Sequence, residues 1–379
     1  MLTRILSGDF PRSSVLSVAL LAILLALAFA PFLFSGAQPL NVAAKICVFI
    51  LLVASYDLLL GYTGIVSFAH TMFFGIGGYG AAIALARLGP TWEALALGIA
   101  AAIVVACALA LVIGLFSLRV RAIFFAMITL AVASAFAVLA SQLSGFTGGE
   151  DGLNYSVPEV LRPSFRLLES PFLGTVVNGR VITYYIVFFA SLAGFLILLR
   201  VVNSPFGRVL QAIRENDFRA EALGYPVVVY RSIASVVSAV LAAFAGVLLA
   251  LWLRYTGPDT TLSFAIMIDV LLIVVIGGMG TLYGAVIGAT LMIVAENYLQ
   301  AVMGRLGEAA SGIPFVSSLL SADRWLLWLG ILFVLSVYFF PTGIVGKLRT
   351  AAEARKQSKT QRLSETEIMR GPKSRQSTD

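Results

Sequence analysis

The chain contains little charge for its length. Of its 379 residues only 12% are Asp, Glu, Lys or Arg, whereas 60% are hydrophobic. One water-soluble core cannot enclose that much apolar surface, so a soluble globular protein is excluded and an integral membrane protein is indicated. The formal net charge is +7, but the cations lie in loops between apolar runs and in the C-terminal tail. Membrane topology accounts for cations in those places, so nucleic acid is not expected as a partner.

Histidine and cysteine are nearly absent. His70 is the single histidine, and the two cysteines, Cys47 and Cys107, lie far apart in apolar runs, outside any C-x-x-C spacing. A zinc or haem site built by the protein is therefore excluded, because such sites need clustered histidine and cysteine ligands. Both thiols are predicted to be reduced and buried.

A nucleotide-binding loop is also missing from the sequence. The stretch nearest to G-x-x-x-x-G-K-[ST] is TGIVGKLR at residues 342–349. It lacks the correctly spaced first glycine and the hydroxyl after Lys347. No nucleophile and base stand out as a pair either. We therefore predict a chain that is not an enzyme and that binds no cofactor of its own.

Long apolar runs dominate what is present. A membrane span needs about 20 mostly apolar residues, and this rule predicts an all-α, polytopic membrane protein with about ten spans, of which eight to ten are full crossings. The predicted spans are residues 14–34, 41–60, 65–86, 93–115, 121–141, 182–202, 232–253, 265–282, 284–303 and 325–345. Residues 61–92 and 277–284 are rich in glycine and are predicted to be broken or re-entrant. For the first run we favour a retained helix, and the alternative is a cleaved signal peptide, because Ala28 and Ala30 form an A-x-A-like site.

The basic loops give an orientation. Lys and Arg near span ends concentrate on the cytoplasmic side, which predicts a transmembrane domain of residues 14–346 with both termini in the cytoplasm. Residues 1–13 form the cytoplasmic N-terminus, residues 142–181 a periplasmic segment and residues 203–231 a cytoplasmic loop. The basic tail, residues 347–379, is polar and is predicted to be disordered. We assign it no role.

The loop of residues 203–231 is the one sharply polar segment inside the hydrophobic region. Its many charges cost about 2.5 to 3.5 kcal/mol for each Arg or Asp at mid-bilayer, so it cannot span. Ser204 suits an N-cap, Pro205 the first helical position and Gly224 a left-handed C-terminal residue, and Pro226 stops any continuation. We predict one amphipathic helix, held in water, that lies against a partner.

Five blocks of the sequence resemble the permease subunits of branched-chain amino acid ABC transporters, the high-affinity branched-chain amino acid permease family. The blocks are GYTGIVSFAHTMFFGIGGYGAA (residues 61–82), RAIFFAMITLA (121–131), FTGGEDGL (146–153), GRVLQAIRENDFRAEALG (207–224) and VLLIVVIGGMGTLYGAVIGA (270–289). Each block alone is weak, but the ordered set is specific. An ordinary basic loop is the alternative interpretation of the polar segment.

The resemblance implies that residues 204–224 form the coupling helix, which sits in a groove of a separate ATP-hydrolysing subunit. The residues expected at this contact are Arg208, Ala212, Ile213, Arg214, Glu215, Asn216, Ala220, Leu223 and Gly224. Among them Arg214, Glu215 and Asn216 would orient the contact, and Ile213, Ala220 and Leu223 would supply its apolar part.

The resemblance also implies a set of partners and a cargo. ABC ATPase subunits would use the ATP, a second homologous permease would complete the pore in the lipid bilayer of the inner membrane, and a periplasmic substrate-binding protein would deliver a branched-chain amino acid. One alternative is a urea or short-chain amide ABC permease. An ion-coupled secondary transporter is another, and it would be expected to have paired ionisable residues at mid-membrane.

Two glycine-rich segments, one in each half of the hydrophobic region, are candidates for the substrate pathway. Broken helices expose backbone groups to a polar substrate while shielding them from lipid. The candidate residues are Ser67, Phe68, His70, Thr71, Gly277, Gly278 and Met279. Close packing of small residues is the alternative, and for His70 a buried imidazole satisfied by a backbone carbonyl is the alternative to a proton relay. Asp57, Asp269 and Glu296 are the acids nearest membrane depth, and none has a basic partner at i,i+4.

Overall fold

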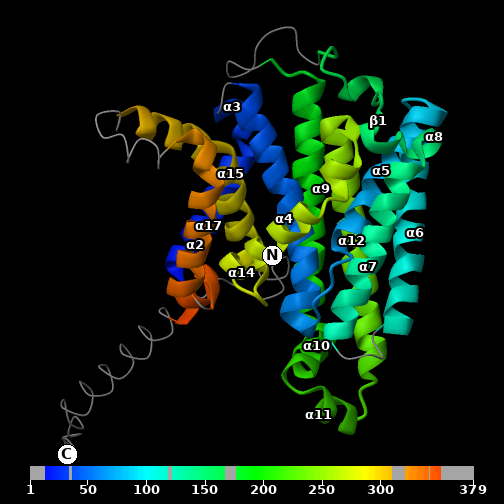
Figure 1. Ribbon diagram of the computed structural model, residues 1–379, viewed down its shortest axis with the longest axis vertical. Coiled ribbons are helices and arrows are strands. Elements are labelled where there is room, and N and C mark those ends of the chain that lie inside the picture. Colours follow the sequence, from blue (N-terminus) through cyan, green and yellow to red (C-terminus); the bar gives the residue numbers. More distant parts are fainter. Residues whose placement is uncertain are drawn as a thin grey trace, which may run out of the picture.

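The computed structural model describes residues 13–33, 36–117, 122–166, 176–309, 321–340 and 342–350. Within these residues the chain is almost entirely helical, and the long helices run along the length of the molecule (Figure 1). Eight helical segments of the described residues are long and apolar enough to cross a membrane. Two shorter apolar helices accompany them. The prediction of an all-α, polytopic membrane protein is confirmed.

The membrane-length segments are α4 (Ala37–Thr63), α5 (His70–Leu88), α6 (Trp92–Ser117), α7 (Ala122–Gln142), α9 (Gly179–Val202), α12 (Val227–Leu253), α13 and α14 together (Pro258–Thr261, Phe264–Gly277) and α15 (Leu282–Ala309). The shorter apolar helices are α2 (Ser14–Ala28) and α17 (Trp325–Phe339). The remaining elements are α3 (Ala30–Leu33), α8 (Ser144–Thr147), η1 (Gly149–Asp151), β1 (Leu153–Asn154), η2 (Glu159–Leu161), α10 (Pro205–Glu215), α11 (Asp217–Ala222), β2 (Tyr255–Thr256) and η3 (Ala322–Arg324).

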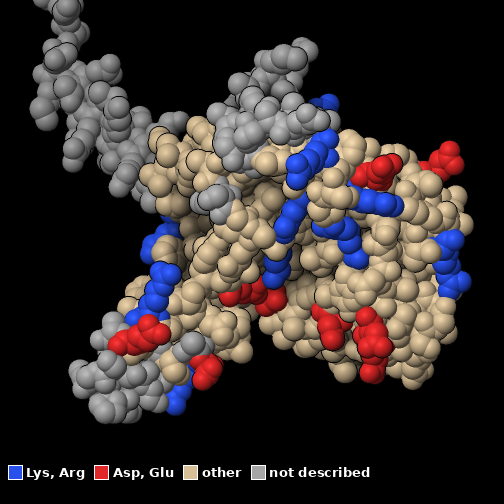
Figure 2. Space-filling view, turned by 90° about the horizontal axis from the view of Figure 1, so that it is seen from above, with Lys and Arg blue, Asp and Glu red and all other residues tan. Residues whose placement is uncertain are grey.

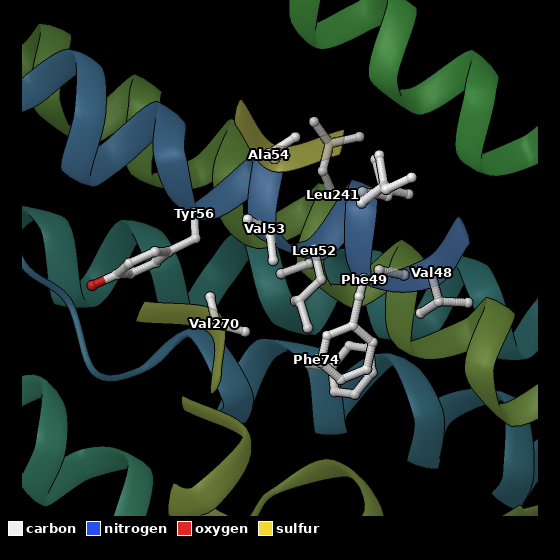
Figure 3. Packing of buried hydrophobic residues seen from close by; sticks show 14 of the residues in the cluster. Val48, Phe49, Leu52, Val53, Ala54, Tyr56, Phe74, Leu241 and Val270 are labelled. Carbon is white, nitrogen blue, oxygen red and sulfur yellow. The ribbon is translucent and has the colours of Figure 1, made fainter. Parts of the chain in front are cut away.

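Helix α4 is the centre of the bundle. In its most apolar stretch 94% of the residues are buried, against 17% in α7, although the two helices have similar mean hydropathies of 2.1 and 2.5. Figure 3 shows α4 side chains such as Phe49 and Leu52 among Phe74 of α5, Leu241 of α12 and Val270 of α14. The apolar surfaces of α6 and α7 are left for lipid or for another subunit.

Both glycine-rich segments are broken, as predicted. α4 and α5 are separated by residues 64–69, and α14 and α15 are separated by residues 278–281. Positive φ angles at both breaks explain the glycines there: Gly64 has φ +73° and Gly278 has φ +117°. Glycine adopts such angles without steric cost.

The two ends of the bundle differ (Figure 1). Helices α10 and α11 project from one end, and α8 and β1 lie at the other. The assignment of residues 203–231 to the cytoplasm and of residues 142–181 to the periplasm stays a prediction. Figure 2 shows the second of these ends, where basic and acidic side chains are interspersed over the described surface.

A small sheet stabilises the end that carries β1. β1 and β2 pair antiparallel, with Leu153 opposite Thr256. The hydroxyl of the next residue, Tyr155, donates to the carbonyl oxygen of Ala250 at 2.8 Å and lies 3.0 Å from Oγ1 of Thr256. Burial raises the pKa of Tyr155, so the phenol stays protonated and remains a donor. The loop is thereby tied to the end of α12.

Candidate functional site

The polar segment forms two short helices. α10 begins at Pro205, after the N-cap Ser204, and ends at Glu215. Asn216 then adopts an extended conformation, with φ −161°, and its side-chain oxygen accepts a hydrogen bond from the Arg219 amide at 2.9 Å. Asn216 thus caps α11, which corrects the prediction of a single helix over residues 204–224. The segment ends as predicted, at Gly224 with φ +91° and with Pro226 before α12.

The inner face of this helix pair packs on the chain itself. Ile213 and Ala220 are only 1% and 3% exposed, and they form a small cluster with Val227 at the start of α12. They cannot supply the apolar part of a contact with a partner, as was expected of them. The large exposed apolar side chains of this segment are instead Leu223, which is 72% exposed, and Phe218, which is 81% exposed.

The sequence analysis missed Phe218. The sequence contained a signal for it, because Phe218 is a large aromatic side chain within a run of charged residues. The remaining predicted contact residues lie on the exposed side of the pair: Arg208, Ala212, Arg214, Glu215, Asn216 and Gly224.

Arg214 is an exposed residue, but its guanidinium extends toward the membrane helices. Its Nη1 donates a hydrogen bond to the carbonyl oxygen of Gly61, in the last turn of α4. Its stem lies over Gly64, where a Cβ atom would come within 3.3 Å of Cγ of Arg214. The guanidinium also lies beside Gly280, where a Cβ would be 2.8 Å from Nη1. Arg214 therefore connects α10 to both helix breaks.

Asp57 occupies the centre of this connection. The residue is 2% exposed, and its Oδ1 accepts a hydrogen bond from the Gly280 amide at 2.9 Å. Its Oδ2 is buried and has no hydrogen-bond partner among the described residues. The guanidinium of Arg214 and Oδ1 of Asp57 both lie beside Gly280, and a nearby positive charge offsets part of the cost of burying a carboxylate. We call Asp57, Gly61, Arg214 and Gly280 the coupling junction.

Glycine is required at two positions of the junction. A Cβ on Gly61 would overlap both Asp57 and the backbone of Gly280. Gly280 itself has φ +77°. The backbones of α4 and of the α14–α15 break can therefore approach closely enough for one carboxylate to join them.

The predicted pathway residues divide between the two breaks. Gly277 is the last residue of α14, and Gly278 and Met279 belong to the α14–α15 break next to the coupling junction. A Cβ on Gly278 would lie 3.1 Å from the carbonyl oxygen of Thr342. Of the other candidates, Ser67 and Phe68 belong to the α4–α5 break, and His70 and Thr71 are the first residues of α5. The first group thus lies where the C-terminal helical residues 343–350 meet the bundle.

His70 is part of the packed interior. It is 1% exposed, its Nε2 lies 2.9 Å from Oγ of Ser55 and 3.2 Å from the carbonyl oxygen of Leu52, and its ring meets the edge of Tyr56. These contacts support the interpretation of a satisfied buried imidazole. Ser67 Oγ similarly accepts from the Ala69 amide at 3.4 Å. Phe68 and Thr71, in contrast, line a cavity.

One ion pair links distant membrane helices. Nζ of Lys45 in α4 lies 3.0 Å from Oε2 of Glu296 in α15, and the two side chains are 39% and 17% exposed. The i,i+4 rule could not reveal this partner, because the two residues are 251 positions apart.

Removing one member of this pair is expected to destabilise the fold. Lys45→Met leaves the half-buried Glu296 without its cation, and we expect it to cost about 1 to 2 kcal/mol, between the values for surface and buried pairs. The double variant Lys45→Met/Glu296→Gln should regain most of this loss. Thermal unfolding of the detergent-purified protein measures both effects, and losses that simply add in the double variant would contradict the pairing.

The structure has the features of a permease-type membrane transport subunit. It combines membrane-length helices, two helix breaks and a charged helix pair that lies outside the apolar bundle. The chain belongs to the family described as branched-chain amino acid transport system / permease component, whose family model matches residues 38–337.

Curated relatives agree with this assignment. The chain is 27% identical over 312 residues to the high-affinity branched-chain amino acid transport system permease protein LivM of Salmonella typhimurium. The matched region covers 78% of this chain and 70% of the relative. It is 28% identical over 305 residues to the corresponding permease protein BraD of Pseudomonas aeruginosa, covering 78% and 91% of the two chains. A probable LivM of Methanocaldococcus jannaschii is 27% identical over 256 residues, or 64% and 67% of the two chains. No solved structure gives a significant match.

Proposed function

We propose that this chain is one of two permease subunits of an ATP-binding cassette importer, and that it carries branched-chain amino acids such as Leu, Ile and Val across a bacterial inner membrane. The observation that carries the proposal is the helix pair α10–α11, which projects from the apolar bundle and is joined through Arg214 to both helix breaks. The relatives named above are permease proteins for the same class of cargo.

The proposed partners follow from the two ends of the molecule. ABC ATPase subunits dock on α10–α11 in the cytoplasm and hydrolyse the ATP, so this chain needs no cofactor and performs no chemistry. A second homologous permease completes the pore, and a periplasmic binding protein delivers the amino acid at the end that carries α8 and β1. In this orientation both termini are cytoplasmic.

Coupling is proposed to run through the junction. Closure of the ATPase pair moves α10, and Arg214 passes this movement to the end of α4 and to the α14–α15 break. α4 and the α14–α15 break adopt two arrangements, one that opens the pathway to the outside and one that opens it to the cytoplasm. ATP shifts the population between these two arrangements. α10 can act as a lever because its inner face, with Leu210 and Ile213, is packed firmly on the membrane domain.

The exposed apolar residues of the helix pair should anchor the ATPase. We expect Phe218→Ala and Leu223→Ala each to weaken retention of the ATPase subunits about tenfold, since buried aromatic and aliphatic anchors dominate such contacts. Copurification and binding of the ATPase to the solubilised permease pair measure the loss. Ala222→Ser, a change at an exposed residue of the same helix, serves as the control. Retention unchanged in both alanine variants would place the ATPase elsewhere.

The function itself is tested by uptake into proteoliposomes that contain both permeases and the ATPases, with the binding protein outside and ATP inside. Radiolabelled leucine should accumulate only with ATP. Uptake of urea or acetamide in place of leucine would support the amide alternative. Uptake by this chain alone, driven by a proton or sodium gradient, would support a secondary transporter.

A further inference from the structure

A cavity of about 280 Å³ lies where the α4–α5 break meets α7 and the α13–α14 turn. Its wall includes Phe68 and Thr71 from the break and residues 258–259 and 262–264 from the turn. This volume is near the lower end of the range for small-molecule sites, which suits a ligand of the size of an amino acid.

The start of α5 at this cavity lacks a cap. α5 begins at His70, and its N-cap residue, Ala69, has no side-chain oxygen to accept from the first turn. The amides of His70, Thr71 and Met72 donate no hydrogen bond within the described residues. Ala69, His70, Thr71 and Met72 are all at most 3% exposed, so these amides also lie away from bulk water. A buried helix start with unpaired amides calls for an acceptor.

The neighbouring helix start is built differently. α14 begins after Ser263, whose Oγ accepts a hydrogen bond from the Ala265 amide at 3.2 Å. Its first turn is therefore capped by its own chain. In α5, by contrast, no side chain caps any amide of the first turn. The positive end of the α5 dipole adds to the attraction of these amides for an anion.

The side chain of Thr71 gives a second, independent sign of a ligand. Thr71 is 3% exposed and lines the cavity, yet its hydroxyl has no hydrogen-bond partner among the described residues. Buried polar side chains nearly always have a partner. A group that enters the cavity would meet this hydroxyl at the uncapped end of α5.

An acidic residue also lines the cavity. Asp259 lines the cavity on its exposed side and forms no ion pair with a described residue. Apolar side chains also line the cavity: the rings of Phe68 and Phe264 lie 6.1 Å apart, and Leu262 is a further lining residue. An α-amino acid needs all three kinds of contact, because its carboxylate and ammonium are attached to one carbon together with the aliphatic side chain.

We propose that this cavity is the membrane binding site for the transported amino acid. The amides at the start of α5 and the Thr71 hydroxyl hold the carboxylate, Asp259 holds the ammonium, and Phe68, Leu262 and Phe264 contact the aliphatic side chain. The assignment rests on the proposed function. It places the substrate at the α4–α5 break, which directly follows the end of α4 that carries the coupling junction.

The complete transporter tests the site with two pairs of variants. Thr71→Val removes the hydroxyl at constant shape and should lower leucine uptake about fivefold, whereas Thr71→Ser keeps the hydroxyl and should retain more uptake than Thr71→Val. Asp259→Asn should lower uptake about tenfold. Asp151→Asn, an exposed acid outside the cavity, is its control.

Direct labelling separates a binding role from a structural one. The diazirine analogue of leucine, photoactivated on the solubilised transporter, should label peptides that contain Phe68, Leu262 or Phe264, and excess leucine should compete. Asp259→Asn should reduce this labelling. Normal uptake in both Thr71→Val and Asp259→Asn, with labelling elsewhere, would overturn the site while leaving the transport function intact. Absence of amino acid uptake by the unaltered transporter would instead overturn the function on which the site rests.

Discussion

Arg214→Ala in the assembled transporter is expected to lower amino acid uptake by about 10- to 100-fold while the ATPase subunits remain bound. The arginine makes the one hydrogen bond from α10 to the end of α4 that the structure describes, and it lies beside Gly280. A hydrogen bond from a charged group contributes about 1.5 to 3 kcal/mol, which corresponds to this range. Its loss also leaves the buried Asp57 without a neighbouring cation.

Two controls identify the junction as the cause. Arg219→Ala removes an exposed arginine from α11 and should have little effect on uptake. Arg214→Lys should retain only part of the activity, because an ammonium cannot reproduce the planar fork of a guanidinium. Uptake near the unaltered rate in Arg214→Ala would show that movement reaches the membrane helices by another route.

A double variant tests whether Asp57 and Arg214 act as one unit. If they do, Asp57→Ala/Arg214→Ala should be no slower than the worse of the two single variants. Asp57→Asn retains an oxygen for the Gly280 amide and should be less damaging than Asp57→Ala. If the fold losses of uptake in the two single variants multiply in the double variant, Asp57 and Arg214 act independently.

Composition and local sequence rules predicted the class of the fold well. Apolar length marked the spans, and the residues Ser204, Pro205, Gly224 and Pro226 marked the limits of the polar segment. These features depend on neighbours within a few positions, so they are readable from the chain. The break at Asn216 was missed because its side chain competes with the helix for a single amide, and a favourable periodicity on both sides obscured it.

Contacts between distant segments could not be predicted in the same way. Asp57 was recognised as a costly residue at membrane depth, but its partner, the Gly280 amide, lies 223 positions away. The direction of Arg214 was similarly hidden, since a charged residue on a polar helix is expected to face water. It turns inward because Gly64 and Gly280 leave space for its side chain.

Hydropathy also does not distinguish central from peripheral helices. α4 and α7 are about equally apolar, yet one is enclosed by the bundle and the other is not. In a membrane both lipid and protein neighbours accept apolar side chains. The hydropathy pattern of a span therefore does not show which of its faces points into the bundle. Small residues are the more informative signal, because several glycines of these helices, such as Gly77 and Gly246, lie where another backbone approaches.

The crossing of α5 and α12 is the strongest case. A Cβ on Gly77 of α5 would overlap the carbonyl group of Ala243 in α12, and a Cβ on Gly246 of α12 would overlap the carbonyl oxygen of Phe74 in α5. The two backbones are thus in direct contact at two reciprocal positions. Neither obstacle is a side chain that could rotate away.

Gly77→Val is therefore expected to destabilise the folded protein by about 3 kcal/mol, at the upper end of the range for overpacked sites. The valine can be accommodated only if the helices separate, which would remove the close packing on which their association depends and would displace the α5 start at the proposed binding site. Size-exclusion chromatography and thermal unfolding in detergent should show a lower yield of folded protein and a lower transition temperature. Gly330→Val makes the same chemical change in α17, where no atom lies within 4 Å of the added Cβ, and it should leave both measurements near those of the unaltered protein. Equal stability of the two variants would mean that the α5–α12 contact is loose enough to admit a side chain.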